Sequence, residues 1–132
     1  MRHPRKETYD VAVIGGGPAG MMAAGRAAEL GASVILLEKN EGLGKKLLIT
    51  GGGRCNVTND TPDVRQFLSK LSKGKFLFST FAQHAVKESL DFFNSRGMDT
   101  KVENEGRVFP ASNTARSVYD VLVKYMKDNK VE

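Results

Sequence analysis

The chain contains no tryptophan, a single cysteine and no long uninterrupted apolar run. One cysteine, Cys55, excludes a disulfide within the chain and zinc sites built from paired cysteines, because both need at least two. The basic residues 1–6 are followed by an apolar stretch that is short and broken by glycines, which is typical of neither a signal peptide nor a membrane span. We therefore expect a cytoplasmic protein without a structural metal and without a membrane partner.

Acidic residues are fewer than basic ones, 15 against 20 in 132 residues. This balance favours anionic ligands such as diphosphates but falls short of a nucleic-acid-binding composition, so we expect no specific nucleic acid partner. Most of the lysines are interpreted as ordinary solvated surface. A hydrophobic content of 40% suits one modest domain, and composition does not indicate an oligomeric state.

The most informative pattern is VAVIGGGPAG, residues 11–20, followed by a helical pattern and then by VILLE, residues 34–38. It predicts a strand, a glycine turn, a helix and a second strand ending in an acid, which is the order of a dinucleotide-binding unit. Gly15 suits the tight turn, Gly17 the approach of a diphosphate to the backbone, and Gly20 the close packing of helix on strand. The pattern predicts a nucleotide cofactor, either FAD or NAD.

Two further features support this prediction. Pro18, followed by Ala19, suits a first helical turn whose unpaired N–H groups attract a diphosphate. Glu38 stands at the distance expected of an acid that accepts a hydrogen bond from a ribose 2′-hydroxyl, and it would repel a 2′-phosphate. NADP is therefore not expected in this position.

A second glycine-rich stretch, TGGGRCN at residues 50–56, follows a segment that we expect to be irregular. Three consecutive glycines are costly in folding entropy unless the backbone turns sharply or approaches a ligand. Lys45, Lys46 and Arg54 could place positive charge at a diphosphate or a flavin ring, and Thr50 and Asn56 could hydrogen-bond ring or ribitol oxygens. The alternative is that Lys45 and Lys46 face solvent and that Asn56 and Asn59 cap turns.

Cys55 lies inside this stretch. A thiol beside a flavin can relay electrons, but disulfide reductases of that kind use two cysteines. We therefore interpret Cys55 as a structural thiol.

The remaining residues, 61–132, are predicted to be helical with one hairpin. A first helix is expected to begin at residues 60–62 and to end near Gly74, and a second segment to end at Gly97. The aromatic residues within residues 76–93 are interpreted as core residues rather than as a wall that faces a flavin. His84 is interpreted as a residue on a helix surface. Residues 100–110 are predicted to form two short strands around a turn. The last helix, capped within residues 112–114, is expected to bury one face: Val118, Val121, Leu122, Tyr125 and Met126.

Three motifs in order, VAVIGGGPAGMMAA, ILLEKNEGLGKKLLITGGGRCNVTN and GRVFPASNTARSVYDVL, resemble the amino-terminal part of the YhiN/BaiN-like bacterial flavoproteins, also labelled NAD(P)/FAD-dependent oxidoreductases or the aminoacetone oxidase family. The resemblance covers essentially the whole chain. It implies an α/β fold in which a Rossmann-like βαβ unit (residues 9–60, after a flexible basic tail at 1–8) precedes the helical segment with its hairpin. It also implies that residues 1–132 are an incomplete, amino-terminal part of an FAD-binding domain.

The resemblance further implies FAD as cofactor. The implied contacts are Gly15, Gly17, Ala19 and Gly20 at the diphosphate, Glu38 at the adenosine ribose, and Lys46, Thr50, Gly52, Gly53, Arg54, Cys55 and Asn56 along the diphosphate and flavin. Pro18 and Lys39 are also expected to bind the cofactor. Arg107 is implied to lie on the substrate side, where it could bind an anionic substrate. The alternative from the residues themselves is a hairpin arginine paired with an acid such as Glu103.

The expected function is flavin-mediated redox chemistry on a small organic substrate, with NAD(P)H as electron donor and catalytic residues outside this chain. Reduction of double bonds and oxidation of amines both remain open. Two other classes remain open as well: an NAD-binding dehydrogenase module, which leaves the glycine-rich residues 50–56 unexplained, and a noncatalytic nucleotide-binding or regulatory protein.

Overall fold

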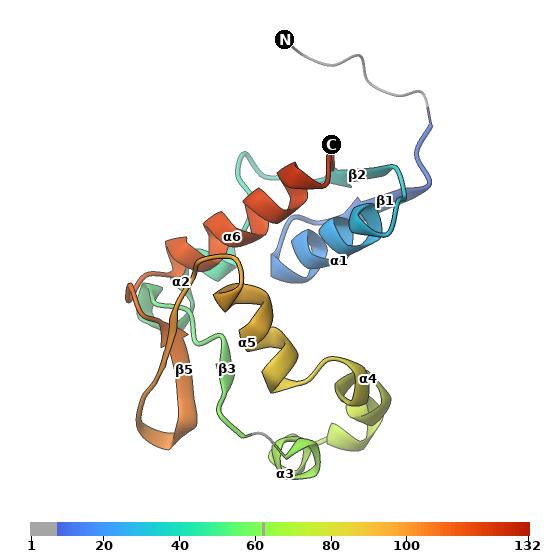
Figure 1. Ribbon diagram of the computed structural model, residues 1–132. Helices are drawn as coiled ribbons and strands as arrows, with labels where there is room; N and C mark the ends of the chain where they lie inside the picture. Colours follow the sequence, from blue (N-terminus) through green and yellow to red (C-terminus); the bar gives the residue numbers. More distant parts are fainter. Residues whose placement is uncertain (1–7, 62) are drawn as a thin grey trace. The chain divides into compact units, whose positions relative to one another are not determined.

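The computed structural model describes residues 8–61 and 63–132, so the expected basic tail lies, apart from Thr8, outside the described residues. The chain divides into two compact units, one of Met1–Leu48 with Tyr119–Glu132 and one of Ile49–Val118. Figure 1 labels most of the elements of both. Each unit has its own small sheet, which is parallel in the first and antiparallel in the second.

The first unit contains the predicted strand, helix and strand. β1 (Val11–Ile14) pairs in parallel with β2 (Val34–Leu37), and α1 (Pro18–Glu29) connects them and packs on both strands. The helix buries Met21 and Ala24 completely. The dinucleotide-type βαβ unit is therefore confirmed as a fold.

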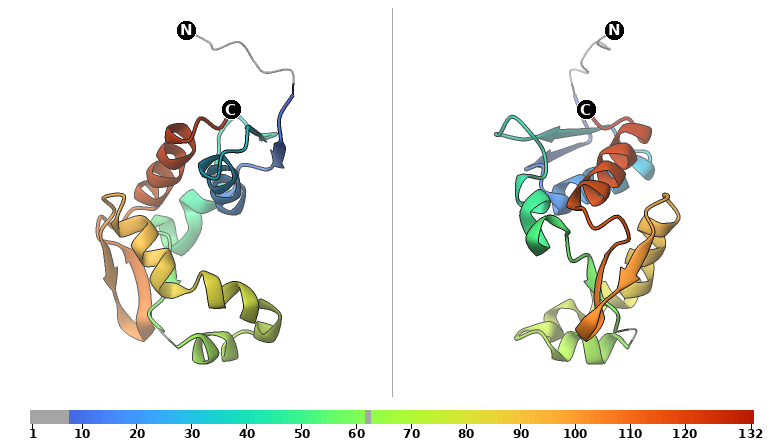
Figure 2. Two further views of the ribbon diagram at one scale, coloured as in Figure 1. Left: turned by 45° about the vertical axis from the view of Figure 1, so that its right-hand side comes forward. Right: turned by 90° about the vertical axis from the view of Figure 1, so that its left-hand side faces the viewer.

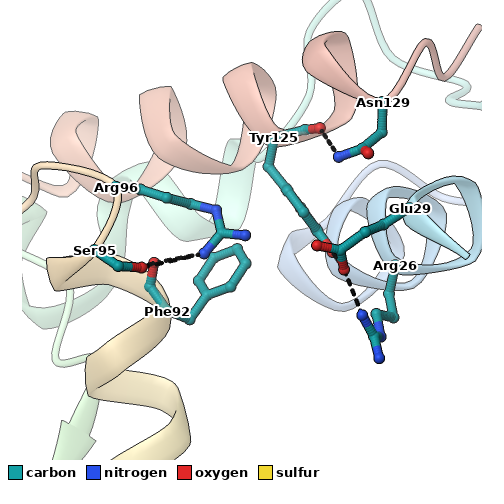
Figure 3. Close-up of polar contacts among 7 residues, drawn as sticks. All are labelled: Arg26, Glu29, Phe92, Ser95, Arg96, Tyr125 and Asn129. Carbon is teal, nitrogen blue, oxygen red and sulfur yellow. Dashed lines mark hydrogen bonds and ion pairs between the residues drawn. The ribbon is translucent and has the colours of Figure 1, made fainter.

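The carboxyl-terminal half of α6 (Ala115–Asp128) belongs to the same unit and packs on α1. A Cβ on Gly25 would lie 2.4 Å from the Tyr125 ring, so the two helices approach closely because this residue has no side chain. The Tyr125 hydroxyl donates to Glu29 at 2.7 Å, and Arg26 pairs with the same carboxylate (Figure 3). All five apolar residues predicted for the buried face of this helix are buried.

The end of the chain lies along β2. Glu132 donates through its N–H to the Val34 carbonyl at 3.1 Å and accepts from the Leu36 N–H at 2.6 Å. These two bonds are the pattern of a parallel pairing, in which one residue bonds two positions of its neighbour.

The second unit contains a sheet in the order β3 (Thr58–Asn59), β5 (Arg107–Pro110), β4 (Thr100–Val102). The turn between β4 and β5 is η2 (Asn104–Gly106), so the predicted hairpin is confirmed. Val108 and Phe109 of the central strand are buried. The sheet packs on α5 (Val86–Asn94), at whose end Arg96 lies over the Phe92 ring (Figure 3).

The helices before this hairpin are shorter than the sequence pattern suggests. They are α3 (Val64–Ser69), η1 (Gly74–Leu77) and α4 (Phe78–Gln83), drawn in yellow-green in Figure 2. The start expected at residues 60–62 is wrong, because the Asp63 carboxylate caps α3 by accepting from the Gln66 N–H at 2.7 Å. Pro62 lies outside the described residues.

Two other expectations are wrong. The segment expected to be irregular contains α2 (Lys45–Gly53), which is helical until Thr50 turns to φ −67° and ψ 152°. The aromatic residues expected in the core include Phe76 and Phe78, whose exposed fractions are 86% and 47%, whereas Phe93 is buried. Periodicity alone cannot separate a buried face from an exposed one in helices of one or two turns.

Candidate nucleotide-binding site

The turn between β1 and α1 is built from glycines with different tasks. Gly15 has φ +103° and donates through its N–H to the Leu37 carbonyl at 2.8 Å, which fixes the turn to β2. A Cβ on Gly20 would lie 1.9 Å from the Gly15 carbonyl oxygen. Helix and strand can therefore approach this closely only with glycine at position 20.

Gly17 faces open space. It precedes α1 with an extended backbone (φ −75°, ψ 178°), and a Cβ built on it meets nothing within 4 Å. Pro18 and Ala19, which follow, are exposed, and no described side chain caps the first turn. The first-turn N–H groups of a helix have no partner inside the helix, so this end offers amide donors and a partial positive charge to an anion.

Glu38 lies against the same turn. Its carboxylate accepts from the Gly16 N–H at 2.7 Å and from the backbone N–H and side-chain amide of Asn40 at 2.9 and 2.8 Å. These bonds, the Asn40 backbone N–H foremost and then that of Gly16, lower the pKa of Glu38, with a small opposing contribution from desolvation. The carboxylate is held charged and in a fixed orientation at the end of β2.

Gly16 is a residue that the sequence reasoning missed. It is buried, and a Cβ on it would lie 2.3 Å from Leu43 and 3.2 Å from a Glu38 carboxylate oxygen. Gly44 donates through its N–H to the Gly16 carbonyl at 2.8 Å. The sequence does contain a signal for this contact: Gly42 and Gly44 flank Leu43 and allow the chain to cross over the turn between β1 and α1.

The lysines predicted near this site, Lys39 and Lys46, are both exposed. Neither makes a side-chain hydrogen bond or ion pair among those recorded for the described residues, whereas Lys87 and Lys124 do. Lys45 is exposed as well, so the alternative that Lys45 and Lys46 face solvent agrees with this structure.

The second glycine-rich stretch forms a left-handed turn in the second unit. Gly51, Gly52 and Gly53 all have positive φ, between +56° and +84°. A Cβ on Gly51 would lie 2.9 Å from the backbone nitrogen of Asn56, whereas a Cβ on Gly52 or Gly53 would meet no atom within 4 Å. The turn therefore needs glycine for its backbone at all three positions and leaves a bare surface at two of them.

Arg54 is turned toward the sheet. Its guanidinium lies 2.7 Å from the Glu103 carboxylate and 4.0 Å from the centre of the Phe109 ring. Glu103 also pairs with Lys101 at 3.1 Å, and its pKa is lowered, chiefly by the Lys101 hydrogen bond and with a contribution from the Arg54 charge. Phe109 and Glu103 lie more than 45 positions along the chain from Arg54, so no local pattern predicted these contacts.

Cys55 and Asn56 complete the turn. The Cys55 thiol is buried, burial raises its pKa, and a hydrogen bond with Thr50 opposes that rise. The Asn56 side-chain amide donates to the Thr58 and Val108 carbonyls at 2.8 and 3.1 Å, which ties the turn to β3 and β5. A structural role for both residues agrees with these contacts.

Arg107 lies at the exposed start of β5. Its Nε donates to the Asn104 carbonyl at 3.1 Å and lies 3.9 Å from the Glu105 carboxylate. The alternative of a hairpin arginine paired with a nearby acid agrees with this contact, although the acid is Glu105, whereas Glu103 forms its ion pairs with Arg54 and Lys101. The exposed position leaves the Arg107 guanidinium accessible to an anion.

Within residues 8–61 and 63–132, no group of three or more histidine, cysteine, aspartate or glutamate side chains could hold a metal ion. None of the helices in the same residues has the length and apolar composition needed to cross a membrane.

The sequence matches a known protein family. The model of the HI0933-like protein Rossmann domain matches residues 9–132. The chain belongs to this family. The match begins at the first strand of the βαβ unit and includes the second unit, so it confirms the family that the three motifs resemble.

Similar curated proteins include the 3-dehydro-bile acid delta(4,6)-reductase of Clostridium scindens, 37% identical over 92% of this chain and 30% of the relative. The ribosomal RNA dihydrouridine synthase of Escherichia coli is 32% identical over 89% of this chain and 28% of the relative. A solved structure, the open conformation of a flavocytochrome c3 fumarate reductase, aligns with a TM-score of 0.70 and 25% identity over 96% of this chain and 26% of that chain. The chain thus spans less than a third of the length of each.

Proposed function

We propose that the chain binds FAD as part of an oxidoreductase that adds hydrogen to a carbon–carbon double bond. The observation that carries this proposal is the open amide surface at Gly17, on a βαβ unit whose second strand ends in a charged, orientated carboxylate. The family match and the flavoprotein structural neighbour favour FAD over NAD as the nucleotide.

The residues present fit the proposed cofactor. The backbone from Gly15 to Gly20 would hold the diphosphate, because a Cβ on Gly17 would meet no atom within 4 Å and no side-chain hydrogen bond caps the start of α1. Glu38 would accept from a ribose hydroxyl, since its lowered pKa keeps it an acceptor at neutral pH. Gly52 and Gly53 leave a bare backbone surface within the second unit, since a Cβ on either would meet no atom within 4 Å.

The reaction class comes from what the similar proteins share. A bile acid delta(4,6)-reductase, a dihydrouridine synthase and a fumarate reductase each act, by name, where a double bond becomes saturated. A bound flavin supplies hydride transfer, while the protein supplies binding, orientation and electrostatics. NAD(P)H is the proposed electron donor, and Arg107 is a proposed contact for an anionic group of the substrate.

We also propose that the protein acts in the cytoplasm. A single thiol that is buried in a turn requires no oxidising environment, and burial protects it as a structural group.

The test is to release and identify the chromophore of the longest natural form of this protein by absorbance and mass, because the chain spans less than a third of its relatives. We expect FAD at near one equivalent per chain, and bleaching of the flavin bands by NADH or NADPH in the absence of oxygen. Addition of an unsaturated ketone should restore the bands, whereas the saturated ketone should not. Release of NAD or of no nucleotide after saturation with FAD would contradict the proposal.

A further inference from the structure

A second candidate binding site lies in the helical part of the second unit, and it does not depend on flavin chemistry. An open hollow of about 690 Å³ is lined by residues of α3, η1, the segment between them and the start of α4, all within residues 65–78. This volume falls in the range of small-molecule sites. No motif singled out in the sequence accounts for it.

Local sequence explains why a hollow forms here. Arg65, Leu68 and Ser69 recur at spacings of three and four and therefore lie on one face of α3. The chain then turns back at Gly74, where a Cβ would lie 2.0 Å from the Leu68 carbonyl oxygen. Phe67 and Phe81, with ring centres 5.0 Å apart, hold α3 and α4 together.

The cavity lining combines apolar surface with unpaired positive charge. Leu68, Leu71 and Phe78 supply the apolar part, and Leu71 and Phe78 are 42% and 47% exposed. Such exposure of large apolar side chains around one hollow is typical of a binding surface.

The charged part consists of Arg65, Lys73 and Lys75, all exposed. The ion pairs recorded for the described residues include none of the three. The sequence contains no aspartate or glutamate from residue 64 to residue 83. A fourth cation, Lys70, is already used, because it donates to Thr61 at 2.9 Å and to Asn59 at 3.2 Å.

We propose that this cavity, lined by Leu68, Leu71 and Phe78 beside Arg65, Lys73 and Lys75, binds a small amphipathic organic anion: an apolar body that carries a carboxylate. The apolar body would cover the exposed leucine and phenylalanine, and the carboxylate would meet cations for which no ion pair is recorded among the described residues. Ser69 and Ser72 add hydroxyl donors at the same lining. A hollow of this volume suits one compact ligand better than a nucleic acid strand, which needs an extended track of cations and stacking rings.

The test uses octanoate and 1-octanol, which have the same chain length and differ in charge. Each is titrated into the isotopically labelled full chain, and backbone amide shifts are followed by NMR. We expect saturable shifts confined to residues 65–78 and tighter binding of octanoate than of 1-octanol. The triple variant Arg65→Gln, Lys73→Gln, Lys75→Gln should weaken octanoate binding about tenfold and leave 1-octanol unchanged.

Two further variants separate the apolar and charged contributions. Leu71→Asn should weaken both ligands, and the control Lys87→Gln, Lys124→Gln, which removes charge elsewhere, should weaken neither. Equal binding of the two ligands, or shifts outside residues 65–78, would overturn the proposal. Displacement of octanoate by a short oligouridylate that binds more tightly would also overturn it, in favour of a nucleic acid surface. No flavin is involved, so this outcome is independent of the proposed oxidoreductase function.

Discussion

The two glycine-rich stretches of this chain look alike in sequence but work differently in the structure. At residues 15–20 the glycines remove side chains so that backbone amides form a bare surface at the start of α1. At residues 51–53 they allow positive φ, and the side chains that follow bind the neighbouring sheet: Arg54 contacts Glu103 and Phe109, Cys55 is buried, and the exposed Asn56 bonds Thr58 and Val108. The first stretch leaves the backbone bare at Gly17, before α1, and the second is a turn anchored to a sheet that leaves Gly52 and Gly53 bare.

Glycine content alone therefore does not identify a ligand-binding surface in this chain. What distinguishes the two stretches is the direction of the neighbouring side chains, which depends on the element that follows. The helix α1, which begins after residue 17, leaves the N–H groups of its first turn without partners inside the helix. Residues 54–56 instead precede β3, which pairs with β5, and their side chains contact that sheet.

The largest effect expected is that of Gly20→Val. Because its Cβ would lie 1.9 Å from the backbone oxygen of Gly15, the helix cannot keep its position on the strand. We expect a loss of about 3 kcal/mol in the free energy of unfolding, measured by chemical denaturation. The matched control is Ala23→Val, on the exposed side of the same helix, and an equal small loss in both variants would contradict the packing role of Gly20.

Gly17→Val should separate binding from folding. The built Cβ meets no atom within 4 Å and the backbone is extended, so we expect a loss of about 1 kcal/mol in unfolding free energy. The added side chain would occupy the space assigned to the diphosphate, and FAD binding, followed by flavin fluorescence, should be abolished. Unchanged flavin content in the folded variant would remove this assignment.

Glu38→Gln should weaken FAD binding about tenfold, because a neutral amide replaces a charged acceptor. The exposed Glu41→Gln removes the same charge close by in the chain and should leave affinity unchanged. If the ribose role is correct, binding to the wild-type protein should also depend on pH.

Since the folded pKa of Glu38 lies below its ordinary value, its contribution to stability is fully present above the unfolded pKa of about 4.3 and is lost as the pH falls through the folded pKa. FAD affinity should fall over the same acidic range. An affinity that does not differ between wild type and Glu38→Gln at any pH would refute the ribose role.

Arg54→Ala should test whether the second stretch is anchored by side chains. Loss of the contact with the buried Phe109 ring should lower the unfolding free energy by about 2 kcal/mol. Arg96→Ala removes an equally close stack, 4.0 Å over Phe92, at the exposed end of α5, and should lower it by about 0.5 kcal/mol. Thermal unfolding of the two variants side by side gives the comparison, and a smaller loss for Arg54 would mean that the turn is anchored elsewhere.

Arg107→Ala should have the smallest effect on stability, within about 0.5 kcal/mol, since its side chain is exposed and its nearest carboxylate is 3.9 Å away. If Arg107 contacts substrate, the variant should raise KM more than it changes flavin content. Steady-state kinetics that match the wild type would leave it as a hairpin residue only.

The sequence by itself determined the βαβ unit, the tasks of Gly15 and Gly20, the hairpin and the buried face of the last helix. These depend on local periodicity and on the backbone freedom of glycine, which neighbouring residues specify. Only the tertiary structure placed Gly16 under Leu43, turned Arg54 onto Phe109, and exposed Phe76 and Phe78. Those positions depend on which distant strand or helix packs against them, and contacts between residues far apart in the chain leave no periodic signal in one sequence.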